Sequence, residues 1–239
     1  GTQTIVLSPG TYRLTLAGAG ENSAATGDLD ITGSVTIAGT GAAATTIDAG
    51  QLDRVLHVQN SANVSLPGIT ITRGQLTGAV VEGAGVFNEG GTLTISDSVL
   101  TVNSAIGPAS RGGAIYSDAF ATTTVKTSTL SNNTAAFGGA INADGSAFIE
   151  SSAVLNNTAT VYGGGAYLGA AARITNSTFD GNQAVNSVGG AVNVGAGPLY
   201  IEQSTLTNNS AGSFGGGVYN ANGNVYLQNS IIASNTATG

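Results

Sequence analysis

An asparagine returns at a nearly constant interval in this chain from residue 100 onward. Each copy stands three residues after an apolar residue and two before an alanine, at steps of 24 to 30 residues. The six copies are Asn103, Asn133, Asn157, Asn182, Asn209 and Asn235. A repeat of this length is typical of a solenoid, and it constrains the fold more strongly than local helix or strand preferences do.

Two further landmarks recur in each unit: a pair of small residues before an apolar pair, and a short alternating run that ends in serine. The first occurs at Gly112–Ile115, Gly138–Ile141, Gly164–Tyr167, Gly189–Val192 and Gly216–Tyr219, and the serines are Ser98, Ser128, Ser152, Ser177, Ser204 and Ser230. Each unit thus contains three short apolar runs separated by Gly, Asn, Ser or Asp, which is the punctuation of strands. No run has the length or the period of a helix.

These patterns predict an all-β fold, a single right-handed parallel β-helix with three short strands per coil and about nine coils. We expect one domain over residues 1–239. Residues 1–75 should form irregular N-terminal coils, and residues 76–239 should form regular repeats of about 26 residues. The return path around each coil supplies the crossover that parallel strands need.

The recurrent asparagines are predicted to form a structural ladder. An asparagine that points inward at a coil corner offers two donors and an acceptor to its neighbours and to the backbone. The paired glycines are expected at turns and close contacts between coils. They are not expected to bind phosphate, because no helix follows them.

Composition excludes several classes of function. The chain has 239 residues, a net charge of −7, six Lys and Arg in total, one His and no Cys. So few basic residues disfavour a nucleic-acid partner. The absence of Cys removes disulfides and thiolate chemistry, and a lone His makes a zinc site improbable. We expect no cofactor, no metal and no membrane span in this chain, and any secretion or anchoring segment should lie outside it.

The glycine landmark and the recurrent asparagine resemble the repeats of the polymorphic outer-membrane-protein family, which pair Gly-Gly-Ala-Ile with Phe-x-x-Asn. The first motif occurs at 112–115 and 138–141, and the second at Phe179–Asn182; other units have Leu, Val or Ile in place of Phe. The segments at 27–32, 52–57 and 68–72 resemble secreted bacterial β-helix proteins of the pectin-lyase-like superfamily. These resemblances imply the β-helix fold, an extracellular or bacterial cell-surface location, and no particular reaction.

The alternative function is a polysaccharide lyase or glycosidase that acts on acidic glycans. Such enzymes need paired carboxylates, or acidic metal ligands with a basic residue. Asp28 and Asp30 fall on the same face of a strand, but we interpret them as solvated. Lys126, Glu150 and Arg173 fall on one outer face and are weighed as a catalytic group, with a surface ion pair as the simpler reading.

Two further hypotheses carry less weight. His57 is the only histidine and lies in no nucleophile motif, so catalysis by it is not favoured. An ice-binding face needs a threonine rank on every coil. A rank begins at Thr92 and Thr122 but fails at Ala171.

Assembly or adhesion is the function that the sequence favours. A row of large apolar residues precedes the glycines and is a candidate partner strip, formed by Phe137, Tyr162, Val188 and Phe214. The last coil carries no capping sequence, and open β ends favour pairing with another chain. We therefore expect a non-catalytic extracellular stalk, adhesin or fibre subunit that associates end to end through its open coils, or that binds a cell-surface or glycan ligand.

Overall fold

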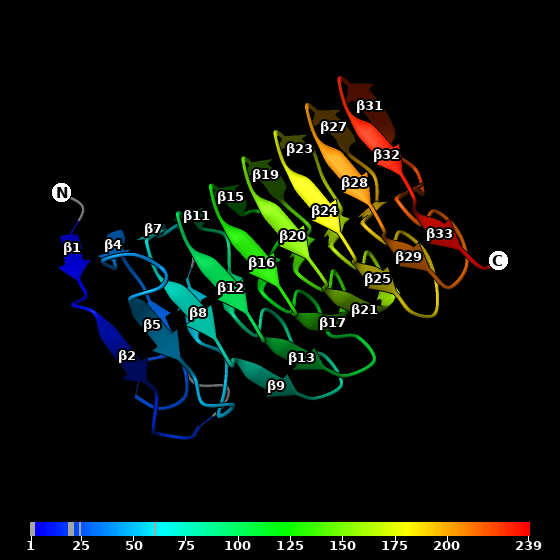
Figure 1. Cartoon of the computed structure of the whole chain (residues 1–239). Coiled ribbons are helices and arrows are strands. Elements are labelled where there is room, and N and C mark those ends of the chain that lie inside the picture. The colour runs from blue at the N-terminus through cyan, green and yellow to red at the C-terminus, as the bar shows by residue number, and fades with distance from the viewer. Residues whose placement is uncertain (1–2, 19–21, 24, 60) are drawn as a thin grey trace.

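The computed structural model describes residues 3–18, 22–23, 25–59 and 61–239. Every regular element among these residues is a strand, and all pairings between strands are parallel. The chain winds through eight complete coils and a partial ninth, stacked along one axis from the N-terminal to the C-terminal end (Figure 1). The predicted right-handed parallel β-helix is confirmed.

Four sheets run along the solenoid, and from the third coil onward the chain visits them in the order A, B, D, C. Sheet A contains β1 (Gln3–Val6), β4 (Val35–Ala38), β7 (Asn63–Pro67), β11 (Thr92–Ser96), β15 (Thr122–Lys126), β19 (Ser146–Glu150), β23 (Ala172–Thr175), β27 (Pro198–Glu202) and β31 (Asn224–Gln228). Sheet B contains β2 (Gly10–Arg13), β5 (Thr45–Asp48), β8 (Thr70–Thr72), β12 (Val99–Thr101), β16 (Thr129–Ser131), β20 (Ala153–Leu155), β24 (Thr178–Asp180), β28 (Thr205–Thr207) and β32 (Ile231–Ala233). Sheet C contains β3 (Leu29–Ile31), β6 (Leu56–Val58), β10 (Val86–Asn88), β14 (Ile115–Ser117), β18 (Ile141–Ala143), β22 (Ala166–Leu168), β26 (Val192–Val194) and β30 (Val218–Asn220).

Sheet D corrects the prediction of three strands per coil. It contains β9 (Gln75–Thr77), β13 (Ser104–Ile106), β17 (Thr134–Phe137), β21 (Thr158–Tyr162), β25 (Gln183–Ala184), β29 (Ser210–Ala211) and β33 (Thr236–Ala237). All of these strands except β9 begin with a polar residue and an alanine directly after the recurrent asparagine, so they do not stand out as apolar runs. The first two coils contribute no strand to sheet D among the described residues. The division at residue 75 stays a prediction.

The interior is a stack of apolar rows. In sheet B, Leu100, Leu130, Val154, Phe179 and Leu206 pair in register and are fully buried. Most of the other inward positions join the same continuous cluster. Because each strand lies about 4.8 Å from the next, every apolar residue packs on its equivalent one coil away.

The recurrent asparagines form a continuous chain of hydrogen bonds along the corner between sheets B and D. Asn133 donates from its backbone N–H and from Nδ2 to Oδ1 of Asn157, at 2.9 and 3.0 Å. The same two bonds join each successive pair from Asn103 to Asn235. The serines form a second row at the corner between sheets A and B, where the Ser98 N–H donates to Ser128 Oγ at 3.1 Å and the pattern repeats to Ser230.

Glycine is required at the two positions of each pair for different structural reasons. The first glycine of each run, whether the run has two glycines or three, has a positive φ between 61° and 75°, as at Gly138 and Gly163. The second faces the next coil, and a Cβ on Gly139 would overlap the carbonyl oxygen of Gly164. Runs of three glycines at 163–165 and 215–217 shift the register, so Tyr167 pairs with Asn142 rather than with Ile141.

None of the described residues belongs to a helix that is long and apolar enough to cross a membrane.

Candidate functional site: a groove over sheet C

The outer face of sheet C carries an unusual row of side chains. The middle residue of each sheet C strand points away from the core, and these residues pair in register over all eight strands. In order they are Asp30, His57, Phe87, Tyr116, Asn142, Tyr167, Asn193 and Tyr219. At the usual strand spacing the row is about 34 Å long. It forms the floor of a groove parallel to the solenoid axis.

Two walls flank this floor. One wall is the row of residues that precede the glycines: Glu82, Arg111, Phe137, Tyr162, Val188 and Phe214. The other is the row that follows each sheet C strand: Glu89, Asp118, Asp144, Gly169, Gly195 and Ala221. The predicted partner strip thus forms one wall of the groove. Phe137 and Tyr162 have ring centroids 5.4 Å apart, Val188 is buried and Phe214 is exposed.

Three cavities lie in line over this floor. The N-terminal cavity has a volume of about 730 Å³ and is lined by His57, Phe87 and Glu89 among others. The central cavity, about 150 Å³, is lined by Asn142, Tyr162 and Tyr167. The C-terminal cavity, about 610 Å³, shares the two tyrosines and adds Asn193, Phe214 and Tyr219. The volumes at the two ends fall in the range of small-molecule sites.

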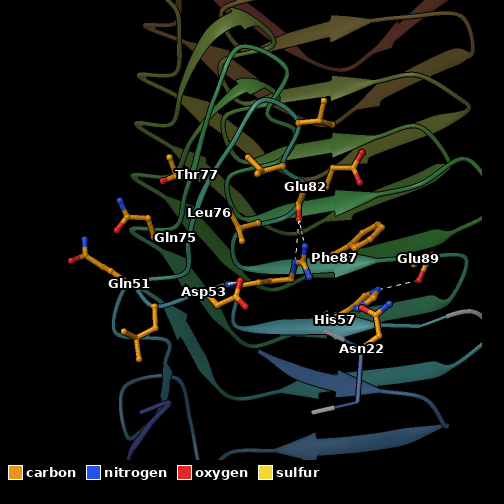
Figure 2. A pocket seen from close by; sticks show the side chains of 14 residues that line it. Asn22, Gln51, Asp53, His57, Gln75, Leu76, Thr77, Glu82, Phe87 and Glu89 are labelled. Atoms are coloured by element: carbon orange, nitrogen blue, oxygen red, sulfur yellow. Dashed lines mark hydrogen bonds and ion pairs between the residues drawn. The ribbon is translucent and has the colours of Figure 1, made fainter. Parts of the chain in front are cut away.

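Charged side chains crowd the N-terminal end. His57 lies between two carboxylates, with Nδ1 3.0 Å from Asp30 Oδ1 and Nε2 3.1 Å from Glu89 Oε2. Figure 2 shows the contact with Glu89. Only the doubly protonated ring donates to both. The His57 ring also stacks on Phe87, with centroids 4.8 Å apart and planes nearly parallel. Arg54 donates to Asp28 Oδ2 at 2.8 Å.

Desolvation changes the pKa of several carboxyl groups at the N-terminal end of the groove. Desolvation raises the pKa of Asp53, Glu82 and Asp28 above the usual range, although nearby arginines oppose the shift. Asp53 is 3% exposed, and its Oδ2 has no hydrogen-bond partner. Buried carboxyls with raised pKa values on the wall of a cavity are typical of functional sites.

The middle and the C-terminal end of the groove are lined by different side chains from the N-terminal end. Arg111 bridges Glu82 and Asp144, at 3.6 and 3.4 Å, and Tyr116 donates its hydroxyl to Asp144. Beyond this point the floor carries only tyrosines and asparagines. Asn142 is 2% exposed, and its Oδ1 is a second buried atom without a partner. Two of the three such oxygens found among the described residues therefore belong to residues that line the groove, although neither oxygen has accessible surface of its own.

The other candidates from the sequence fall in different places. Asp28 and Asp30 were interpreted as solvated, but both carboxylates are buried beside Arg54 and His57. Lys126 and Glu150 are neighbours on sheet A, and Arg173 pairs instead with Glu202 at 2.8 Å. These three residues lie on sheet A, outside the groove. Thr92, Thr122 and Ser146 pair in register, as the threonine rank requires.

Asp28, Asp30 and His57 have potential metal-ligand atoms within 4.8 Å of one another. Their geometry does not favour an ion, because both carboxylates already accept hydrogen bonds. Arg54 donates to Asp28, and His57 and Gln59 donate to Asp30. The cluster is better described as a hydrogen-bonded charge network.

No protein-family model and no curated protein matches this chain. Among solved structures, it is similar to the crystal structure of the pectin methylesterase from Aspergillus niger, with 15% sequence identity and a TM-score of 0.57. The match covers 100% of this chain and 82% of the enzyme chain. A likeness at this identity shows the right-handed parallel β-helix fold and leaves the activity open.

Proposed function

We propose that this chain is a non-catalytic extracellular β-helix that binds glycans in the groove over sheet C, as a surface stalk or adhesive module. The observation that carries the proposal is the C-terminal half of the floor, where tyrosines alternate with asparagines from Asn142 to Tyr219. Aromatic faces pack against sugar rings, and amide groups hydrogen-bond to hydroxyls. A repeating floor suits a polymer of repeating units.

Replacing both Tyr167 and Tyr219 with Ala should weaken glycan binding by roughly tenfold or more, because each aromatic contact contributes about 0.5–1.5 kcal/mol. Affinity is to be measured by calorimetry on the best ligands from a broad glycan array. The control is Tyr226→Ala, which removes an exposed tyrosine from the outer face of sheet A. Equal losses in the control and the double variant would contradict the proposal, as would an array without any ligand.

A glycan-active enzyme is the second candidate. It is supported by Asp53 and Glu82, two carboxyls with raised pKa values on one cavity, and by the fold likeness to a pectin methylesterase. Lys126, Glu150 and Arg173 are not part of this version, because they lie away from the groove. Incubation of the array ligands with the protein, with and without calcium, distinguishes the two candidates: released fragments or methanol would favour the enzyme.

We also propose that copies associate end to end. Leu227 and Ile232 continue inward rows of the core on β31 and β32, but are 56% and 39% exposed at the C-terminal end of the structure. At the other end, Val6 on β1 is 71% exposed. Unpaired strand edges with apolar side chains favour stacking of a second solenoid.

Electron microscopy at high and low protein concentration should show filaments at the higher one, and Leu227→Asp should disperse them. Short single rods at both concentrations would contradict end-to-end assembly. They would leave the glycan-binding proposal intact.

A further inference from the structure

We propose that the C-terminal cavity of the groove binds a neutral sugar unit, whose two adjacent hydroxyl groups are held by the side-chain amide of Asn193. The proposal rests on the proposed function and names the class of glycan that the same groove selects. It departs from the sequence-based alternative, which assigned acidic glycans to this chain.

The first argument is an amide that the protein leaves unused. Asn193 is the middle residue of β26, lines the C-terminal cavity and is 3% exposed. Neither polar atom of its side chain has a hydrogen-bond partner among the described residues, and both retain accessible surface, unlike Asn142 Oδ1. A nearly buried amide without partners is costly unless a bound molecule completes its hydrogen bonds.

The chemistry of this amide decides what it can hold. A primary amide presents an acceptor oxygen and a donor NH₂ group side by side. Two adjacent hydroxyl groups of a sugar match this pair, because one hydroxyl donates to the oxygen while its neighbour accepts from the nitrogen. A carboxylate only accepts, so it would satisfy the nitrogen and leave the oxygen of Asn193 without a donor.

The second argument is charge. None of the described residues that line this cavity is charged. Arg111, on the neighbouring central cavity, is shared between Glu82 and Asp144. Burial, and then the negative charge of Asp144, raise the pKa of the Tyr167 hydroxyl, while Arg111 opposes the shift less strongly. A uronate would therefore lose hydration here without gaining a counter-charge, whereas a neutral sugar avoids that cost.

The third argument is shape. Tyr167 and Tyr219 pair with Asn193 from the coils on either side, so the two tyrosines are two strand spacings apart, about 9.6 Å. Phe214 is 57% exposed on the first wall, and the second wall at the coil of Asn193 is Gly195. A sugar ring that reaches the amide therefore meets aromatic side chains on the floor and on one wall, and the glycine leaves it room on the other.

The test compares neutral hexasaccharides with their oxidised forms, in which the primary alcohol of each unit has become a carboxylate. The probes are the β-1,4-linked hexamers of glucose, mannose and galactose. We expect at least one neutral hexamer to bind the native protein, about tenfold or more tightly than its oxidised form, because the carboxylate is desolvated without a partner. Methylation of the two adjacent ring hydroxyls should weaken binding of that hexamer by about tenfold, since both hydrogen bonds to the amide are lost.

Asn193→Leu should weaken binding of the neutral hexamer by about tenfold while preserving the fold. The variant keeps most of the side-chain volume and breaks no hydrogen bond within the protein, because the amide has no partner there. Its melting temperature should therefore equal or exceed the native value. The matched control is Asn224→Leu, the same exchange at an exposed position on the outer face of sheet A, which should leave the affinity unchanged.

Each other outcome overturns a specific statement. Equal binding of the neutral and oxidised hexamers, or native affinity in Asn193→Leu, overturns the neutral-sugar site and leaves glycan binding standing. A clear fall in the melting temperature of Asn193→Leu would show that the amide is structural, and binding confined to uronates or amino sugars on the glycan array would show that the class is wrong. Binding of no glycan of any kind would overturn the proposed function as well.

Discussion

Asn157→Ala is expected to destabilise the folded chain by roughly 2–6 kcal/mol, since it leaves two buried donors of Asn133 without an acceptor at about 1–3 kcal/mol each. The same substitution removes the bonds from Asn157 Nδ2 to the Leu130 carbonyl and to Asn182 Oδ1. No water reaches this corner to compensate, because both side chains have no exposed surface. The melting temperature should fall by on the order of 10 °C, by calorimetry or circular dichroism.

The matched control is Asn186→Ala, which removes an exposed asparagine from a turn with a negative φ. Its melting temperature should stay within about a degree or two of the native value, as for most surface substitutions. At temperatures where Asn157→Ala is still folded, its glycan affinity should equal that of the native chain. An unchanged melting temperature in Asn157→Ala would show that the asparagine row contributes little to stability.

The repeat predicts the fold well because the spacing of Asn, Gly and Ser determines which residues stack. It does not predict the groove, because the register of two coils cannot be read from the repeat. The glycine runs at 163–165 and 215–217 each allow two alignments, and the one based on Gly-Gly-Ala places Tyr167 and Tyr219 with the core residue Ile141. The structure shifts both by one position, to the outer row. A shift of one residue moves a side chain to the opposite face of a strand.

The N-terminal charge cluster was hidden for a different reason. Asp30, His57 and Glu89 belong to three coils of unequal length, the first two within the part predicted to be irregular, so their distances in sequence do not reveal the pairing. The sequence singles out Asp28 and Asp30 as a pair on one strand face, and His57 separately as the only histidine. Their burial follows from neighbours on adjacent coils, such as Arg54 and Gln59, that no local pattern connects to them.

The Phe-x-x-Asn motif at 179–182 leads to the second large effect. Phe179 is the largest fully buried side chain, between Val154 and Leu206 in the sheet B row. Its ring lies against Gly165, where the adjacent coils have Ala140 and Ala191. Phe179→Ala should therefore lower the free energy of unfolding by about 3–5 kcal/mol, through lost burial and the cavity that remains.

The repeat itself provides the matched variant, because Leu occupies this row in other coils, at Leu100, Leu130 and Leu206. Phe179→Leu should cost less than about 1.5 kcal/mol, since it keeps most of the apolar volume at a position that accepts Leu elsewhere. Both values come from denaturant titration with fluorescence or circular dichroism. If both variants lost the same stability, the effect would be specific to the ring and its fit against Gly165. A large difference between them would mean that the row requires apolar volume at every coil, which is the physical reason the motif tolerates Leu, Val and Ile in place of Phe.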